Sequence, residues 1–140
     1  MTARTVNLVA AALGGEGGGV FTNWLADVAE REDWFCQTTA LAGVAQRTGA
    51  TIYYLEFFPR SSRHEEIPVM SLFPAQGDID IAVASEIAEA ARMVQRGFVT
   101  ADRTTLIASD HRVYSIGEKQ GLGDSTADAE HLSEVAGRYS

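Results

Sequence analysis

Apolar residues occur along the chain in short runs that polar or glycine-rich segments separate. Residues 6–13 form a near-continuous apolar run, which is typical of a parallel strand covered on both faces. The segment GGEGGG at residues 14–19 ends this run. Apolar residues then recur at helical spacing, at Phe21, Trp24, Leu25 and Val28, with Asp27, Glu30, Arg31 and Glu32 supplying the polar face and end. The pattern predicts a strand, a glycine turn and a helix.

Four further strands and two further helices are predicted downstream. Residues 35–41 and 51–58 are rich in β-branched and aromatic side chains, which favour strands. Residues 78–83 predict a strand that leads into a helix beginning at Glu86, and residues 104–108 predict another strand. A last helical stripe starts at Ala127 and contains Leu132, Val135, Ala136 and Tyr139.

Strands that alternate with helices indicate an α/β fold with three layers, α/β/α, around a mostly parallel, Rossmann-like sheet. Right-handed crossovers would place the first glycine turn at the carboxyl edge of this sheet. The 140 residues are enough for one hydrophobic core without disulfides. We therefore expect residues 1–140 to form a single domain.

Charge and cysteine content exclude several classes of function. With 19 acidic and 11 basic residues the net charge is −8, which disfavours binding to nucleic acid or to an anionic membrane. No apolar run reaches the roughly 20 residues of a membrane helix, and the short run after Arg4 is interrupted by Asn7, unlike a secretory signal. The single cysteine, Cys36, cannot form an internal disulfide. These features indicate a cytoplasmic protein.

The GGEGGG segment is the most specific local motif. Glycines between a strand and a helix expose backbone N–H groups that can bind an anion. The dinucleotide-binding fingerprint nevertheless fails, because its third glycine would fall on Val20. The second predicted strand also ends without the acidic residue that would hold a ribose. Two interpretations remain: a tight structural turn, or contact with a ligand or partner through Gly14, Gly15, Glu16 and Gly17.

A second polar loop lies between the strands predicted at residues 35–41 and 51–58. Its residues Gln46, Arg47 and Gly49 could offer an amide and a guanidinium to a carboxylate or phosphate. An ordinary exposed arginine is the other interpretation.

Other polar residues give no catalytic or metal-binding pattern. Ser109, Asp110 and His111 are adjacent, and adjacent residues rarely reach the geometry of a catalytic triad; a loop hydrogen-bond network is expected. His64 and His131 lack metal-ligand spacing. Cys36 is expected to pack as a small core residue. Glu86 and Glu89 are explained by the positive end of the helix that they begin. We predict no catalytic residue, no metal site and no redox cofactor within the chain.

Three motifs in register carry a family resemblance: GGEGGG, GVAQRTGA at residues 43–50 and DRTTLIASDHRVYSIGEK at residues 102–119. Together they resemble the gamma-type domain of 2-oxoacid:ferredoxin oxidoreductases. The forms GGEGGG and TLIASDHRVY are most similar to the N-terminal portion of the beta subunit of bacterial indolepyruvate ferredoxin oxidoreductase. The resemblance covers nearly the whole chain. It implies a gamma-type domain that is truncated at its C-terminus, because family members continue further.

The resemblance also implies an activity and a division of labour. The enzyme would oxidatively decarboxylate an arylpyruvate, transfer the acyl group to coenzyme A and pass electrons to ferredoxin. Thiamine diphosphate and iron–sulfur clusters would be carried by a partner subunit or domain, so the isolated chain would be inactive. Gly14, Gly15, Glu16 and Gly17, with Gln46, Arg47 and Gly49, would form a surface facing coenzyme A or the partner. The family often has Gln in place of Glu16 and Gly in place of Thr48.

Two other functions are compatible with the residues alone. The chain could be a stand-alone nucleotide- or phosphate-binding module that uses the glycine turn, or a protein-interaction domain without an enzymatic association.

Overall fold

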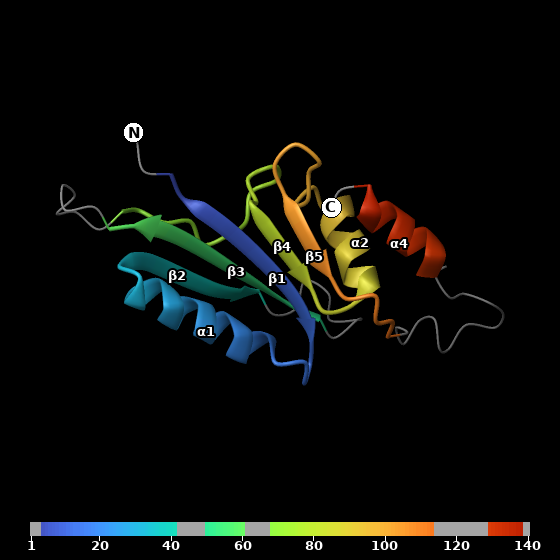
Figure 1. Cartoon of the computed structure of the whole chain (residues 1–140), viewed down its shortest axis with the longest axis horizontal. Coiled ribbons are helices and arrows are strands. Elements are labelled where there is room, and N and C mark those ends of the chain that lie inside the picture. Colours follow the sequence, from blue (N-terminus) through green and yellow to red (C-terminus); the bar gives the residue numbers. More distant parts are fainter. Residues whose placement is uncertain (1–3, 42–49, 61–67, 114–128, 139–140) are drawn as a thin grey trace.

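The computed structural model describes residues 4–41, 50–60, 68–113 and 129–138. The strands and helices that these residues form follow one another in the predicted order (Figure 1). The elements are β1 (Val6–Leu13), α1 (Gly18–Arg31), β2 (Trp34–Leu41), β3 (Ala50–Pro59), β4 (Ile81–Ala84), α2 (Ile87–Gln95), β5 (Thr105–Ala108) and α4 (Ala129–Gly137).

The strands form one sheet in the order β2-β3-β1-β4-β5. β4 is parallel to both β1 and β5, whereas β3 is antiparallel to its neighbours β1 and β2. Four strands therefore point the same way and β3 runs against them. The reversal follows from chain length: eight residues, 42–49, separate β2 from β3, and a parallel connection needs a dozen or more. The prediction of a mostly parallel sheet is confirmed.

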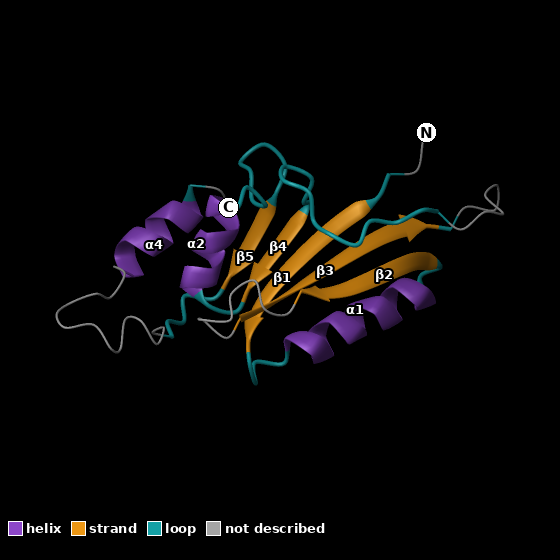
Figure 2. Cartoon of the chain, turned by 180° about the vertical axis from the view of Figure 1, so that it is seen from behind, coloured by secondary structure: helices purple, strands orange, loops and turns teal. Residues whose placement is uncertain are grey.

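Helices cover both faces of this sheet, as Figure 2 shows from behind. Alternate residues of β1 face opposite layers, because successive side chains of a strand point to opposite faces. Leu8 and Ala10 pack with α1 side chains such as Phe21, whereas Val9 and Ala11 belong to the core cluster that α2 and α4 complete. The predicted three-layer α/β/α architecture is confirmed.

Helix α1 differs from its predicted orientation. Trp24 and Val28 were expected on the apolar face, yet they are 66% and 55% exposed. The residues that α1 buries are small: Gly18, Thr22 and Ala29. Small side chains let the helix backbone approach the sheet closely. Of the four apolar residues predicted to face the sheet, Phe21 and Leu25 pack against it, whereas Trp24 and Val28 point outward.

The C-terminal helix α4 packs on α2. Ala136 is buried in the core cluster and Leu132 packs against it, as the helical stripe predicted. Tyr139, the last residue of that stripe, lies outside the described residues.

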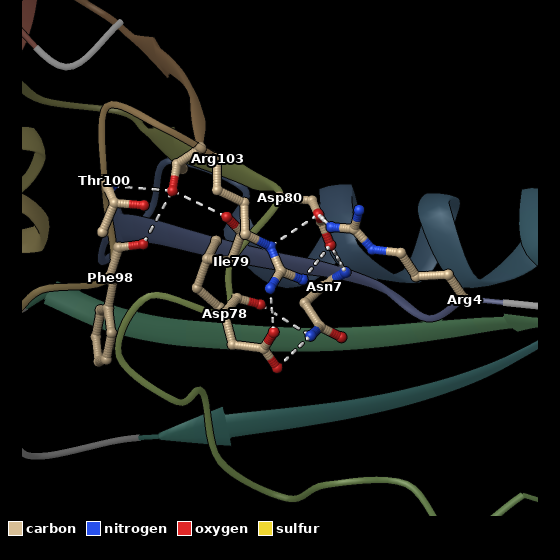
Figure 3. A network of polar contacts seen from close by, with 9 residues as sticks. Arg4, Asn7, Asp78, Ile79, Asp80, Phe98, Thr100 and Arg103 are labelled. Atoms are coloured by element: carbon tan, nitrogen blue, oxygen red, sulfur yellow. Dashed lines mark hydrogen bonds and ion pairs between the residues drawn. The ribbon is translucent and has the colours of Figure 1, made fainter.

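A polar network joins the amino ends of β1 and β4 to the segment before β5 (Figure 3). The Asn7 side-chain amide donates to the Asp78 carbonyl at 2.9 Å, and the Asn7 backbone N–H donates to the Asp80 carboxylate at 2.9 Å. Arg103 forms ion pairs with both aspartates, and Arg4 pairs with Asp80.

These contacts set the ionisation of Asp80. Partial burial is the largest single influence and opposes its ionisation. Hydrogen bonds from Arg103 and Asn7, with the charges of Arg103 and Arg4, outweigh burial and lower the pKa of Asp80. The network therefore holds the three elements together through a carboxylate that stays ionised, at the sheet edge opposite the glycine turn.

Candidate functional site

The carboxyl ends of β1, β4 and β5 lie side by side and define the candidate site. The Ser85 N–H, just after β4, donates to the Ala11 carbonyl of β1 at 3.0 Å, and the Ser109 N–H, just after β5, donates to the Ala84 carbonyl at 2.9 Å. The glycine turn follows β1 at the same edge, as predicted. Loops at this edge commonly carry ligands in sheets of this kind.

Three of the glycines in the turn have a structural explanation. Gly15 and Gly17 have φ values of 86° and 77°, a left-handed conformation that costs a residue with a side chain about 1–2 kcal/mol. Gly18 meets a steric limit instead: a Cβ there would lie 2.7 Å from both Ala12 Cβ and Tyr53 Cε2. The turn thus needs glycine at these positions whether or not it also contacts a ligand.

Glu16 folds back onto the turn that contains it. Its carboxylate accepts a hydrogen bond from the Leu13 backbone N–H at 3.1 Å and another from the Ser85 hydroxyl. The Glu16 N–H in turn donates to the Leu13 carbonyl at 3.1 Å. Glu16 therefore links the glycine turn to the β4–α2 connection and supplies an internal anion where an external phosphate would bind.

A shallow depression of about 230 Å³ lies beside this link. Its walls are mainly apolar, and Glu16 and Ser85 form the polar part of the lining; the other residues are Ala10, Ala11, Ala12, Gly18, Phe21 and Val83. Such a surface suits an apolar or neutral group better than a phosphate, because the only ionised group lining it is a carboxylate.

A buried carboxylate, Glu86, organises the next loop. Glu86 is 2% exposed and caps α2 by accepting from the N–H groups of Ala88 at 2.8 Å and Glu89 at 3.1 Å. Its other oxygen accepts from the Val113 N–H at 3.0 Å and from Arg112 Nη1 at 3.1 Å. Glu86 thus lies at the positive end of α2, as predicted, and it is also the N-cap residue of this helix.

The partner of Glu86, Arg112, was missed by sequence reasoning. Its side chain is only 11% exposed, and it lies 26 residues from Glu86 along the chain. No periodic spacing joins two such residues, so nothing in one sequence indicates the pair. The pair fixes the segment after β5 against the start of α2.

Ser109, Asp110 and His111 form a loop rather than a catalytic arrangement. Ser109 Oγ accepts from the His111 backbone N–H at 3.1 Å, and the His111 carbonyl accepts from the Ile87 N–H at 3.0 Å. All three residues are exposed. The predicted loop hydrogen-bond network is confirmed.

Several other candidates are placed elsewhere or cannot be placed. Gln46, Arg47 and Gly49 lie outside the described residues, as does His64. Cys36 is half-buried beside the α1 layer, and burial, aided by the charge of Glu30 and opposed by Thr38, raises the pKa of its thiol.

His131 lies apart from the candidate site. It is exposed on α4 and lines a groove of about 260 Å³ between α2 and α4, together with Arg92, Arg112 and Leu132.

Glu89 of α2 has a perturbed carboxyl group. Burial raises the pKa of Glu89; the ion pair with Arg92 opposes this effect and the charge of Glu86 reinforces it.

The described residues contain neither a metal-binding cluster nor a membrane-spanning helix. No group of three or more His, Cys, Asp and Glu side chains there is arranged to hold a metal ion. None of the helices described has the length and apolar character to cross a membrane.

Comparison with known proteins places the chain in a family. Residues 7–137 match the family model described as pyruvate ferredoxin/flavodoxin oxidoreductase, a span that contains the covering helices and all of the described sheet except Val6. The comparison with curated proteins found no match. The matched span includes the glycine turn, the buried Glu86–Arg112 pair and the amino-edge network apart from Arg4. The chain belongs to the pyruvate ferredoxin/flavodoxin oxidoreductase family and is a domain of a 2-oxoacid:ferredoxin oxidoreductase.

Proposed function

We propose that the chain is the gamma-type domain of an indolepyruvate ferredoxin oxidoreductase. In this proposal it supports the oxidative decarboxylation of arylpyruvates to acyl-coenzyme A, with electrons passed to ferredoxin. The family match over residues 7–137 is the observation that carries the proposal. The preference for indolepyruvate rests on the resemblance of GGEGGG and TLIASDHRVY to the bacterial beta subunit.

Enzymes of this family use thiamine diphosphate and iron–sulfur clusters, and the residues of this chain do not fit either group. A cluster is usually held by four cysteine thiolates, and the sequence contains Cys36 alone. A diphosphate requires cationic or N–H donors, whereas the described turn presents Glu16. We therefore assign these cofactors to a partner subunit or domain and assign no reaction step to this chain.

The carboxyl edge is proposed to face coenzyme A or the partner subunit. Gly14, Gly15, Glu16 and Gly17 would form this surface, together with the loop residues Gln46, Arg47 and Gly49. The apolar walls of the depression match the uncharged pantetheine arm of coenzyme A. The Glu16 carboxylate would repel its phosphates and so orient the cofactor with its phosphates away from the turn.

Reconstitution tests this proposal. The chain, mixed with the thiamine-binding subunit from the same source, should reduce ferredoxin with indolepyruvate and coenzyme A faster than with pyruvate or 2-oxoglutarate. Neither component alone should do so. Faster turnover of pyruvate would retain the family and reject the indolepyruvate assignment. Turnover by the isolated chain would contradict the division of labour.

The glycine surface is tested separately by Glu16→Gln. Two charges about 4 Å apart repel by roughly 1 kcal/mol in water, and the repulsion falls with distance. Because the proposed orientation holds the phosphates farther from Glu16, loss of its charge should lower the KM for coenzyme A by less than about fivefold. Glu32→Gln, an exposed charge at the far end of α1, is the matched control and should leave the KM unchanged. If Glu16→Gln and wild type had the same KM, the proposal that coenzyme A binds at this surface would be rejected.

The alternative of a stand-alone phosphate-binding module has one observation in its favour. Gly17, the N-cap of α1, provides no side-chain cap, which leaves N–H groups of the first turn available to an anion. Calorimetry of the isolated chain with coenzyme A, NAD, FAD and ATP separates the two functions. Micromolar binding by the chain alone would favour the module.

A further inference from the structure

Helix α1 covers only part of its face of the sheet. It packs on β2, β3 and β1, and none of the described helices lies over β4 and β5 on this side (Figure 2). Three of the four residues of β4 and β5 that point there are apolar: Ile81 and Val83 are partly buried, and Ile107, the neighbour of Val83 in the register, is 56% exposed. The fourth, Thr105, is exposed at the amino end of β5. This half of the face has the character of a buried sheet without its cover.

The outer flank of α1 is also apolar. Val20, Trp24 and Val28 are spaced four residues apart, so they form one stripe along the helix. They are 53%, 66% and 55% exposed. Single exposed apolar residues need no explanation, but a stripe of three that includes a tryptophan is typical of a binding surface.

The stripe and the open half of the sheet are continuous. Phe21, next to the stripe on α1, lines the same depression as Val83 of β4, and both pack on one core cluster. We name this surface the α1–β5 corner and define it by Val20, Phe21, Trp24, Val28, Val83 and Ile107. The helix flank forms its wall and the sheet forms its floor.

The dimensions of the corner correspond to one helix. Two neighbouring strands about 4.8 Å apart give a floor roughly 10 Å wide, which is the diameter of an α-helix with its side chains. A helix laid there would occupy the position that completes the α1 layer over β4 and β5.

Charge distinguishes a different subunit from a second copy of this chain. Exposed Asp27 lies next to the stripe on the helix surface and exposed Glu32 follows at the end of α1, against one basic residue on that side, Arg31. A second copy would also bring a net charge of −8, and like charges at an interface oppose association. The rim therefore matches a partner with basic residues.

We propose that the α1–β5 corner binds an amphipathic, basic-rimmed helix of the partner subunit of the oxidoreductase. This inference rests on the proposed function and adds the surface and the chemistry of the partner. Trp24 is the central anchor, because a large aromatic side chain at the middle of an interface contributes most of its binding energy.

The test uses the full chain and the thiamine-binding subunit, with the dissociation constant measured by calorimetry. Trp24→Asp and Ile107→Asp should each weaken binding about 30-fold or more, the value for loss of a hot-spot residue. The matched control is Val69→Asp, a fully exposed apolar residue in the segment that packs on the opposite sheet face through Glu56; its binding should change less than twofold. Circular dichroism should show all three variants folded.

Two further measurements identify the occupant. Asp27→Lys with Glu32→Lys should weaken binding and reduce its dependence on salt concentration. A photo-crosslinking residue at position 24 should attach to a helix of the subunit that contains Lys or Arg.

The outcomes separate this inference from the proposed function. Wild-type binding that Trp24→Asp and Ile107→Asp leave intact would reject the corner and retain the proposed function. Failure of the wild-type chain to bind the subunit would reject both. A wild-type homodimer that Trp24→Asp converts to a monomer would assign the corner to a second copy and overturn the proposal.

Discussion

Two adjacent glycines at the start of α1 should respond in opposite ways to the same substitution. Gly18 and Gly19 are consecutive, both lie in the first turn of the helix, and each becomes alanine by gain of one methyl group. A Cβ at Gly18 would lie 2.7 Å from Ala12 Cβ and from Tyr53 Cε2, whereas one at Gly19 would have its closest contact with Tyr53 Oη, at 3.6 Å. The sequence environment is shared, so the difference isolates packing between helix and strand.

The expected magnitudes follow from these distances. The Tyr53 ring can rotate away, but Ala12 Cβ is attached directly to the backbone of β1, so relief at Gly18 requires the helix to move by about 1 Å toward the ordinary contact distance. Overpacking of this kind costs about 1–3 kcal/mol, of which helix propensity returns at most ~1 kcal/mol. Gly19→Ala meets ordinary contact and should stabilise the chain by about 0.4–1 kcal/mol.

Urea denaturation followed by tryptophan fluorescence and circular dichroism measures both free energies of unfolding. The free energy of unfolding should be lower than wild type for Gly18→Ala and higher than wild type for Gly19→Ala. Equal stabilisation of the two variants would refute the argument, because it would mean that α1 and β1 do not approach as closely as Gly18 requires. Gly18→Ala should also displace Trp24 and weaken binding at the α1–β5 corner.

Three further predictions concern buried or paired groups. Arg112→Leu should lower the free energy of unfolding by roughly 3 kcal/mol, because the buried Glu86 carboxylate loses its counter-ion; guanidinium denaturation measures this, and an unchanged midpoint would contradict it. The pKa of Asp80 is lowered from 3.8, so its stabilising contribution is present above that pH and lost as the pH falls through the folded value; Asp80→Asn should flatten the acid limb of the stability curve. Burial, with the charges of Glu56 and Asp78, raises the pKa of Tyr54 from 10.0 to about 12, so its contribution is present below pH 10 and lost towards pH 12; Tyr54→Phe should remove the last step of a tyrosinate absorbance titration.

The fold was predictable where one physical rule decided the outcome. The apolar run at residues 6–13 gave the central strand β1, and the short segment between β2 and β3 explains the one reversed strand. The orientation of α1 was not predictable from apolar spacing. Phe21 and Leu25 pack on the sheet as the spacing predicts, yet Trp24 is exposed and the fully buried positions are Gly18, Thr22 and Ala29, because close approach of the backbones depends on small residues.

The candidate site was predictable only in part, for a different reason. The glycine-rich composition of residues 14–19 predicted the turn, and the handedness of crossovers predicted its place at the carboxyl edge. The Glu16–Ser85 contact and the Glu86–Arg112 pair join residues that are distant in sequence. Such pairs leave no periodicity, and a single sequence offers no co-variation to reveal them.

Two glutamates at the carboxyl edge accept hydrogen bonds from backbone N–H groups there. In an α/β sheet the N–H groups at this edge are the usual ligands of phosphates. Here Glu86 accepts two of those at the start of α2, and Glu16 accepts from the N–H of Leu13, the last residue of β1. At α2 a protein carboxylate thus occupies donors that a phosphate would otherwise bind, and at the glycine turn the Glu16 carboxylate disfavours a phosphate by its charge. Apolar surface remains exposed on α1 and β5. This arrangement supports the proposal that the cofactors of the enzyme are held by a partner subunit or domain, to which this chain presents its surfaces.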